Sequence, residues 1–170
     1  AQYGSSGHRR RGWSLIVGID GAEPAVVRQR REIDTLSQAD GATSHWTGPD
    51  DGRLWQALQS RFRLEGQARM GHVVCRVGTV RTHLGAILDR LTELGSRLNA
   101  PAELCSRFGN GLVYGSFPLQ EDGEEPIDFI RTLTEIRRDL ASKRGYLVVE
   151  SAPPAFKAWF DCWGDVGPQI

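Results

Sequence analysis

The chain has 170 residues, of which 39% are hydrophobic and 25% charged, as is ordinary for one globular domain with a buried core. Its 21 basic and 21 acidic residues cancel, which excludes a whole-chain field that would attract nucleic acid or an anionic membrane. The sequence has no apolar run long enough to span a bilayer, and its three cysteines lack metal-ligand spacing. We therefore expect a cytoplasmic protein with reduced thiols and no metal site.

The N-terminal part predicts a flexible lead-in followed by ordered structure. Residues 1–12 are rich in Gly, Ser and Arg and lack periodicity, whereas residues 13–170 should form a single domain. The apolar run 15–19 is flanked by glycines and predicts a strand buried on both faces. A helix should begin at Pro24, and Asp50-Asp51 should cap a second helix.

The segment from 72 to 150 predicts the ferredoxin-like order β-α-β-β-α-β. Residues 72–77 alternate as a strand does, and Thr79 is a candidate N-cap for a leucine-rich helix. A hairpin, a long helix from Pro126 and a last strand at 146–150 follow. The predicted fold class is therefore α+β, in one antiparallel-rich sheet with its helices on one face. Residues 13–64 should extend that sheet with a strand and two helices.

Strand alternation then predicts a polar sheet face. If Val73, Cys75 and Val77 lie under the helices, His72 and Arg76 must point to the opposite side. The same parity places five further polar or aromatic residues there: Glu103, Arg107, Tyr114, Tyr146 and Glu150. Such a mixture is expected where a partner domain closes over a ligand.

Four residues are candidates for a substrate pocket on or near this face: Arg76, Tyr114, His45 and His72. A guanidinium can bind a carboxylate through two parallel hydrogen bonds, but Arg76 could instead pair with Glu103 or Glu150 across strands. Tyr114 could form a hydrogen bond near a ligand or serve as a half-buried sheet aromatic. His45 belongs to a predicted loop, where function and simple packing are both expected. His72, near a strand start, could instead be a satisfied surface histidine.

Several catalytic signatures are absent from the sequence. It contains no GxxxxGK[ST] phosphate loop, no GxSxG nucleophile turn and no histidine pair at metal-ligand spacing. These absences predict that the chain is not a self-sufficient enzyme.

The C-terminal segment resembles a known family. The motifs are Gly145-Tyr-Leu-Val-Val-Glu150, Pro153-Pro154 and Trp163-Gly164, with Asn110-Gly-Leu-Val-Tyr-Gly115 upstream. In wording and order they resemble the C-terminal part of FAD-linked oxidases related to the FAD-binding subunit of bacterial glycolate oxidase. That family continues into a last helix and an Asn-Pro-Gly-Arg motif, neither of which occurs here, so we expect a truncated cap, or substrate, domain.

The resemblance implies oxidation of a small 2-hydroxy acid such as glycolate by hydride transfer to FAD. An N-terminal domain outside this chain would hold most of the FAD, with Tyr114 and Glu150 of the cap near the cofactor. Iron–sulfur and catalytic flavoprotein subunits are the implied partners, through which the protein could lie at the inner membrane. The resemblance fits a catalytic subunit or an accessory one.

Two other functions share the predicted topology, namely RNA binding and regulation by a small ligand. RNA-binding sheets stack bases on aromatic residues of one face. Tyr114 and Phe117 have opposite parity and should lie on opposite faces, which argues against a single stacking platform.

Overall fold

The computed structural model describes residues 13–42, 55–56, 71–98, 102–119 and 125–164. The chain forms two compact units, residues 1–53 and 54–170. The boundary between them lies inside the stretch for which the sequence predicts a single domain.

The described part of the first unit consists of an irregular segment and the helix α1 (Glu23–Ala39). The helix begins as predicted, with proline in its first turn, but none of its residues is buried. The predicted strand at 15–19 is wrong, because residues 13–20 are irregular and Leu15 is 79% exposed. An apolar run becomes a strand only where a sheet edge pairs with its backbone, and composition does not reveal that edge.

The predicted second helix lies mostly outside the described residues. Only Trp55 and Gln56 of this segment are described, and both are helical. Trp55 is 39% exposed.

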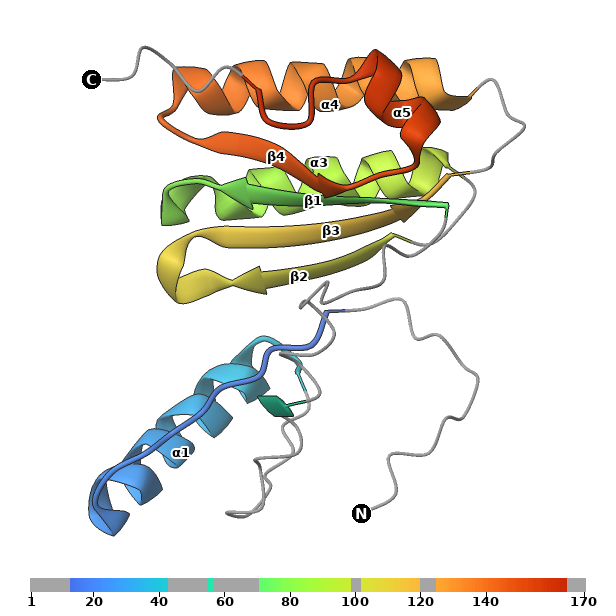
Figure 1. The fold of residues 1–170 in the computed structure, drawn as a ribbon. Coiled ribbons are helices and arrows are strands. Elements are labelled where there is room, and N and C mark those ends of the chain that lie inside the picture. Colours follow the sequence, from blue (N-terminus) through green and yellow to red (C-terminus); the bar gives the residue numbers. More distant parts are fainter. Residues whose placement is uncertain (1–12, 43–54, 57–70, 99–101, 120–124, 165–170) are drawn as a thin grey trace. The chain divides into compact units, whose positions relative to one another are not determined.

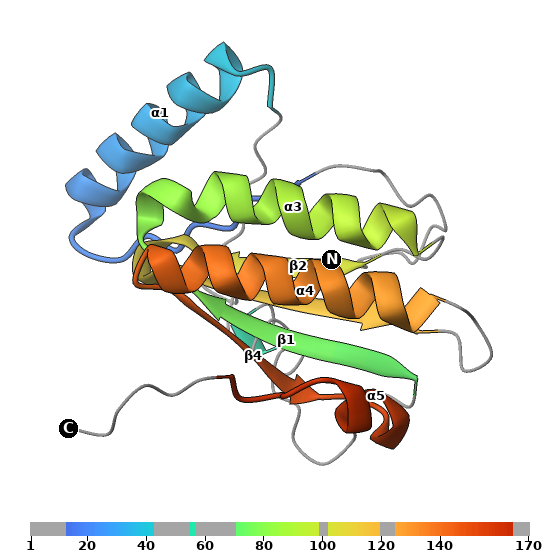
Figure 2. The same ribbon diagram turned by 90° about the horizontal axis from the view of Figure 1, so that it is seen from above.

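The second unit contains a four-stranded antiparallel sheet in the order β2-β3-β1-β4 (Figure 1). Its strands are β1 (His72–Gly78), β2 (Glu103–Arg107), β3 (Leu112–Pro118) and β4 (Tyr146–Ser151). The helices α3 (Leu84–Arg97) and α4 (Glu125–Ser142) lie side by side over one face (Figure 2). The predicted α+β fold is confirmed, and the strand order matches a ferredoxin-like core.

The core lies between the sheet and these two helices. Alternate strand residues meet the helical stripes that recur every three or four positions, so that each element contributes one apolar face. The fully buried members include Val73, Val77, Leu84, Leu91, Val113, Phe117, Phe129, Leu133, Ile136 and Leu140. Burying each such side chain contributes about 1.5–3 kcal/mol. Arg90 on α3 and Asp139 on α4 add an ion pair with a nitrogen–oxygen distance of 3.0 Å.

The junction between β1 and α3 differs from its prediction. A short 3-10 turn, η2 (Arg81–His83), precedes α3, and Thr79 does not cap the helix. The backbone N–H of Thr79 instead donates to the carbonyl of Gly111, 2.9 Å away, which ties the residue to the β2–β3 hairpin. The chain can therefore turn into a helix only after Val80, which is exposed.

The C-terminal residues cover the outer edge of β4. After the helix α5 (Pro154–Trp159), Phe160 is buried, and the carbonyl of Cys162 accepts a 2.7 Å hydrogen bond from the backbone N–H of Val149. Phe160 therefore belongs to the core at this edge of the sheet. Trp159 and Trp163 are instead exposed, at 81% and 72%.

Arg137 of α4 fastens this tail to the sheet. Its Nε donates to the carbonyl of Leu147 at 3.1 Å, and its Nη2 donates to that of Cys162 at 3.4 Å. Its guanidinium carbon lies 4.3 Å from the ring centre of Phe160. Burial lowers the pKa of Arg137.

Replacing Arg137 by methionine should lower the free energy of unfolding by about 2 kcal/mol, because two carbonyls lose a charged donor and one ring loses its cation. Chemical denaturation measures the change. Arg138→Met is the matched control, since Arg138 is the next residue of α4 and is exposed. Equal stability of the two variants would contradict the role given to Arg137.

Candidate functional site on the open sheet face

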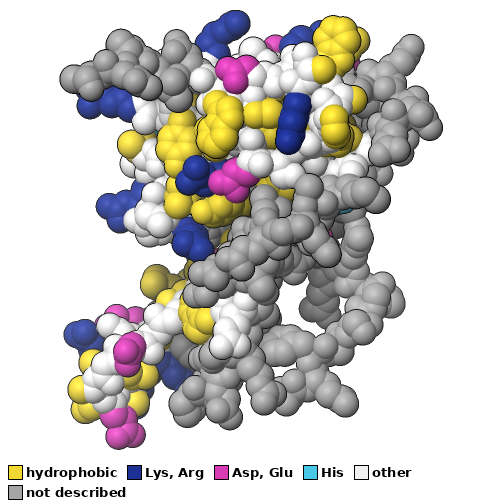
Figure 3. Space-filling model, in the orientation of Figure 1, with side chains coloured by type: hydrophobic (Ala, Val, Ile, Leu, Met, Phe, Trp, Pro, Cys, Tyr) yellow, Lys and Arg dark blue, Asp and Glu magenta, His cyan; other side chains and the backbone are white. Residues whose placement is uncertain are grey.

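The face of the sheet that turns away from α3 and α4 is called the open face here. Glu150, which the ladder leaves without a β1 partner, reaches this face through its contact with Arg76. The strand register assigns fourteen further residues to the face: His72, Val74, Arg76, Gly78, Glu103, Cys105, Arg107, Leu112, Tyr114, Ser116, Pro118, Tyr146, Val148 and Ser151. The alternate residues Val73, Cys75 and Val77 are fully buried beneath the helices, as predicted. Figure 3, drawn from the open side, shows basic and acidic side chains next to each other among hydrophobic ones.

Arg76 occupies the centre of the open face. It lies on β1 between Tyr114 of β3 and Val148 of β4, which are its two cross-strand partners. Its Nε is 2.8 Å from Oε1 of Glu150, and its side chain is 37% exposed. The cross-strand ion pair that was the alternative prediction for Arg76 is thus present, and Glu150 rather than Glu103 is the partner.

The N–H bond at Nε of Arg76 is not aimed at this oxygen. The nitrogen is buried and has no hydrogen bond of acceptable geometry, despite its short distance to Glu150. The contact is therefore an ion pair rather than a linear hydrogen bond. A buried donor without an aligned acceptor is costly, so a better-aligned acceptor that reached it would be bound favourably.

One tyrosine ring lies near this guanidinium, and a second tyrosine is the cross-strand neighbour of Arg76. The ring of Tyr146 lies over Gly78, where any Cβ would overlap with it, and its centre is 5.7 Å from the guanidinium carbon of Arg76. On the other side, Tyr114 lies directly across from Arg76, and the guanidinium carbon of Arg107 is 6.0 Å from the Tyr114 ring centre. Arginine and tyrosine thus alternate across all four strands.

Strand parity predicted Tyr146 and Arg107 on this face, but neither residue was predicted to belong to the site. The signal for Tyr146 was Gly78, since a glycine that ends a strand leaves room for a cross-strand aromatic ring. No comparable signal marked Arg107.

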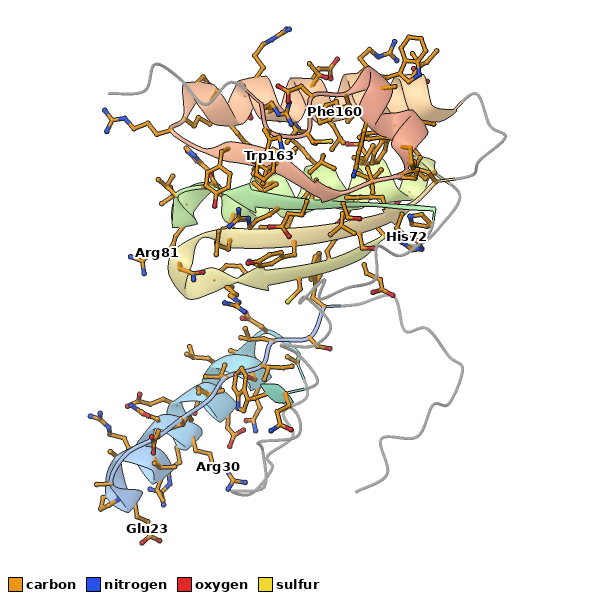
Figure 4. The ribbon with its side chains drawn as sticks, in the orientation of Figure 1. Glu23, Arg30, His72, Arg81, Phe160 and Trp163 are labelled. Carbon is orange, nitrogen blue, oxygen red and sulfur yellow. The ribbon has the colours of Figure 1, made fainter. Side chains whose placement is uncertain are left out.

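His72 lies at the far end of β1, four residues from Arg76 and thus about 13 Å away along the strand. Its Nδ1 is 3.1 Å from Oγ of Ser116, which supports the interpretation of a satisfied histidine. Figure 4 shows it at the opposite end of the sheet from Arg81. Val74, between the two positions, is buried, so solvent reaches the face at Arg76 rather than at Val74.

The structure thus brings together three of the predicted site residues, Arg76, Tyr114 and Glu150, and leaves His72 apart from them. His45 lies outside the described residues. Phe117 is fully buried on the helix side, so it cannot join Tyr114 in an RNA-stacking platform, as predicted.

Other chemistry is limited in the described part of the chain. Burial raises the pKa of the Cys75 thiol to about 12, so this residue is not a nucleophile near neutral pH. Within these residues no group of three or more His, Cys, Asp or Glu side chains could hold a metal ion. None of the described helices is long and apolar enough to cross a membrane. The open face thus presents a guanidinium, whose geometry suits a carboxylate, and tyrosine rings, which suit planar groups.

Comparison of the chain with protein-family models, with curated proteins and with solved structures finds no match. Any functional inference therefore depends on the residues of the open face and on the sequence motifs.

Proposed function

We propose that this chain is the substrate domain of a flavin-dependent 2-hydroxy-acid oxidase of the glycolate type. The open face would cover the isoalloxazine ring of an FAD held mainly by another domain. Arg76 would bind the carboxylate of the substrate, and Tyr114 would border the flavin. The chain alone would then be inactive.

The observation that carries the proposal is Arg76 itself. It is a central, partly exposed guanidinium whose Nε lacks an aligned acceptor. The Tyr146 ring lies near it, and Tyr114 is its cross-strand neighbour. A guanidinium fork matches the geometry of a carboxylate, and aromatic rings provide flat contacts for a conjugated cofactor. The sequence motifs at 110–115 and 145–164 support the same assignment.

The proposal implies partners beyond the flavin domain. Electrons leaving the flavin would pass to an iron–sulfur subunit, and a second flavoprotein subunit would complete the complex. The assembly would be cytoplasmic and could attach to the inner membrane through these subunits.

Expression of the chain together with the flavin-binding domain of its parent protein should give a yellow protein whose flavin is bleached by glycolate without oxygen. A colourless product would contradict the proposal.

Arg76→Lys in that protein should lower kcat/KM for glycolate by roughly 10- to 100-fold, since a lysine cannot form the two parallel hydrogen bonds. Steady-state kinetics measures the effect, with bound flavin as the control for folding. Arg138→Lys provides a matched substitution at an exposed position of α4. Unchanged kcat/KM in Arg76→Lys would remove Arg76 from the site.

A further inference from the structure

We infer that Glu150 is an internal competitor for Arg76, which occupies the guanidinium until a small carboxylate ligand displaces it. The inference rests on the proposed function in one respect, because the ligand concerned is the carboxylate that Arg76 would bind there. It adds an exchange step that controls access to the site.

The backbone delivers Glu150 to this position through an irregularity in β4. Cys75 pairs with Val149, but Val74 pairs with Ser151, so Glu150 is the extra residue of a β-bulge. A bulge interrupts the ladder and redirects a side chain, and bulges are common beside active sites. Here the redirected carboxylate reaches Arg76 at 2.8 Å.

The geometry of the Arg76–Glu150 ion pair favours exchange of the carboxylate. Nε of Arg76 has no aligned hydrogen bond although Oε1 is close, so Glu150 satisfies the charge without satisfying the donor. The side chain of Glu150 is 29% exposed, and water can solvate its carboxylate when it moves away. An incoming carboxylate with better alignment would complete the missing bond.

The guanidinium itself would stay in place during the exchange. The Cα of Arg76 is held between its cross-strand partners on β3 and β4, and the Tyr146 ring over Gly78 limits movement of the side chain on one side. The other arginine of the face, Arg107, lies over the Tyr114 ring at 6.0 Å and has no carboxylate at comparable distance among the described ion pairs. The competition is therefore specific to Arg76.

Titration of the full chain with acetate tests the proposed exchange in the absence of flavin. The side-chain Nε–H signals of arginine are followed by ¹⁵N NMR at constant ionic strength, with chloride replaced by acetate, and the Arg76→Lys variant identifies the Arg76 signal. The Arg76 signal should shift with acetate. Glu150→Gln should bind acetate roughly two- to fivefold more tightly, which corresponds to the worth of a cross-strand ion pair.

Glu103→Gln is the matched control, because it removes a carboxylate from the same face and should leave the acetate affinity unchanged. If Glu150→Gln binds acetate and the unmodified chain does not, the conclusion is the same, and Glu150 competes more strongly than expected. Equal affinities of the unmodified chain and Glu150→Gln, or no acetate effect in either, would overturn it. A colourless co-expression product together with a positive acetate titration would refute the oxidase assignment but leave the exchange intact. A yellow product together with equal acetate affinities would refute the exchange alone.

Discussion

Replacing Phe129 by alanine should lower the free energy of unfolding by about 3–5 kcal/mol, because the large cavity left in the core cannot close. Phe129 is 1% exposed and lies in the middle of a chain of aromatic rings. Its ring centre is 5.4 Å from that of Phe117 on β3 and 5.9 Å from that of Phe156 on α5, both in edge-on geometry. Phe156 in turn contacts Phe160, with 5.3 Å between ring centres.

The substitution would therefore disconnect the C-terminal segment as well as open the core. Chemical denaturation gives the loss of stability, and hydrogen exchange at Val149, whose N–H bonds to Cys162, reports on the tail. Ile127→Ala is the control, since it lies two residues away on α4 and is 74% exposed. Similar losses in the two variants would show that the aromatic chain does not hold the segment in place.

Replacing Gly111 by alanine should cost about 3 kcal/mol or more, the second large effect. Gly111 has a φ of +71°, where a residue with a Cβ is strained by roughly 1 kcal/mol. The added Cβ would also collide with the carbonyl oxygen of Thr79, a backbone atom that cannot move without shifting β1. The substitution should further weaken the hydrogen bond from Thr79 N–H to the Gly111 carbonyl.

Gly109→Ala separates the general effect of losing a glycine from this collision. Gly109 belongs to the same short 3-10 turn, η3 (Phe108–Asn110), and a Cβ there meets no atom within 4 Å. It should change stability by less than about 0.5 kcal/mol in thermal or chemical unfolding. A comparable loss in both variants would argue against the close approach of the hairpin to β1.

The second unit was largely predictable because its periodicities are unambiguous. The alternation at 72–77 and the leucine stripe after it each allow only one buried face, so the side of the sheet on which Arg76 lies followed from parity. The short hairpin and the last strand followed from glycines and β-branched residues.

The failures arose where the outcome depended on distant partners. Residues 15–19 have the composition of a strand, but pairing depends on a sheet edge that the local sequence does not reveal. Thr79 has the chemistry of a cap, yet its backbone is tied to Gly111, 32 positions later in the chain. The choice of Glu150 over Glu103 as partner of Arg76 depended on a bulge, which no residue type specified.

The order of the strands has a consequence for folding during synthesis. β1, the earliest strand of the sheet, pairs with β3 and β4, and its second neighbour is not complete until Ser151 has left the ribosome. Contacts so distant in sequence form slowly, because a long loop must close before they contribute. Until then one side of β1 offers unpaired backbone groups to any other nascent chain. A ribosome stalled before residue 146 should therefore carry a chaperone-dependent intermediate rather than a folded unit.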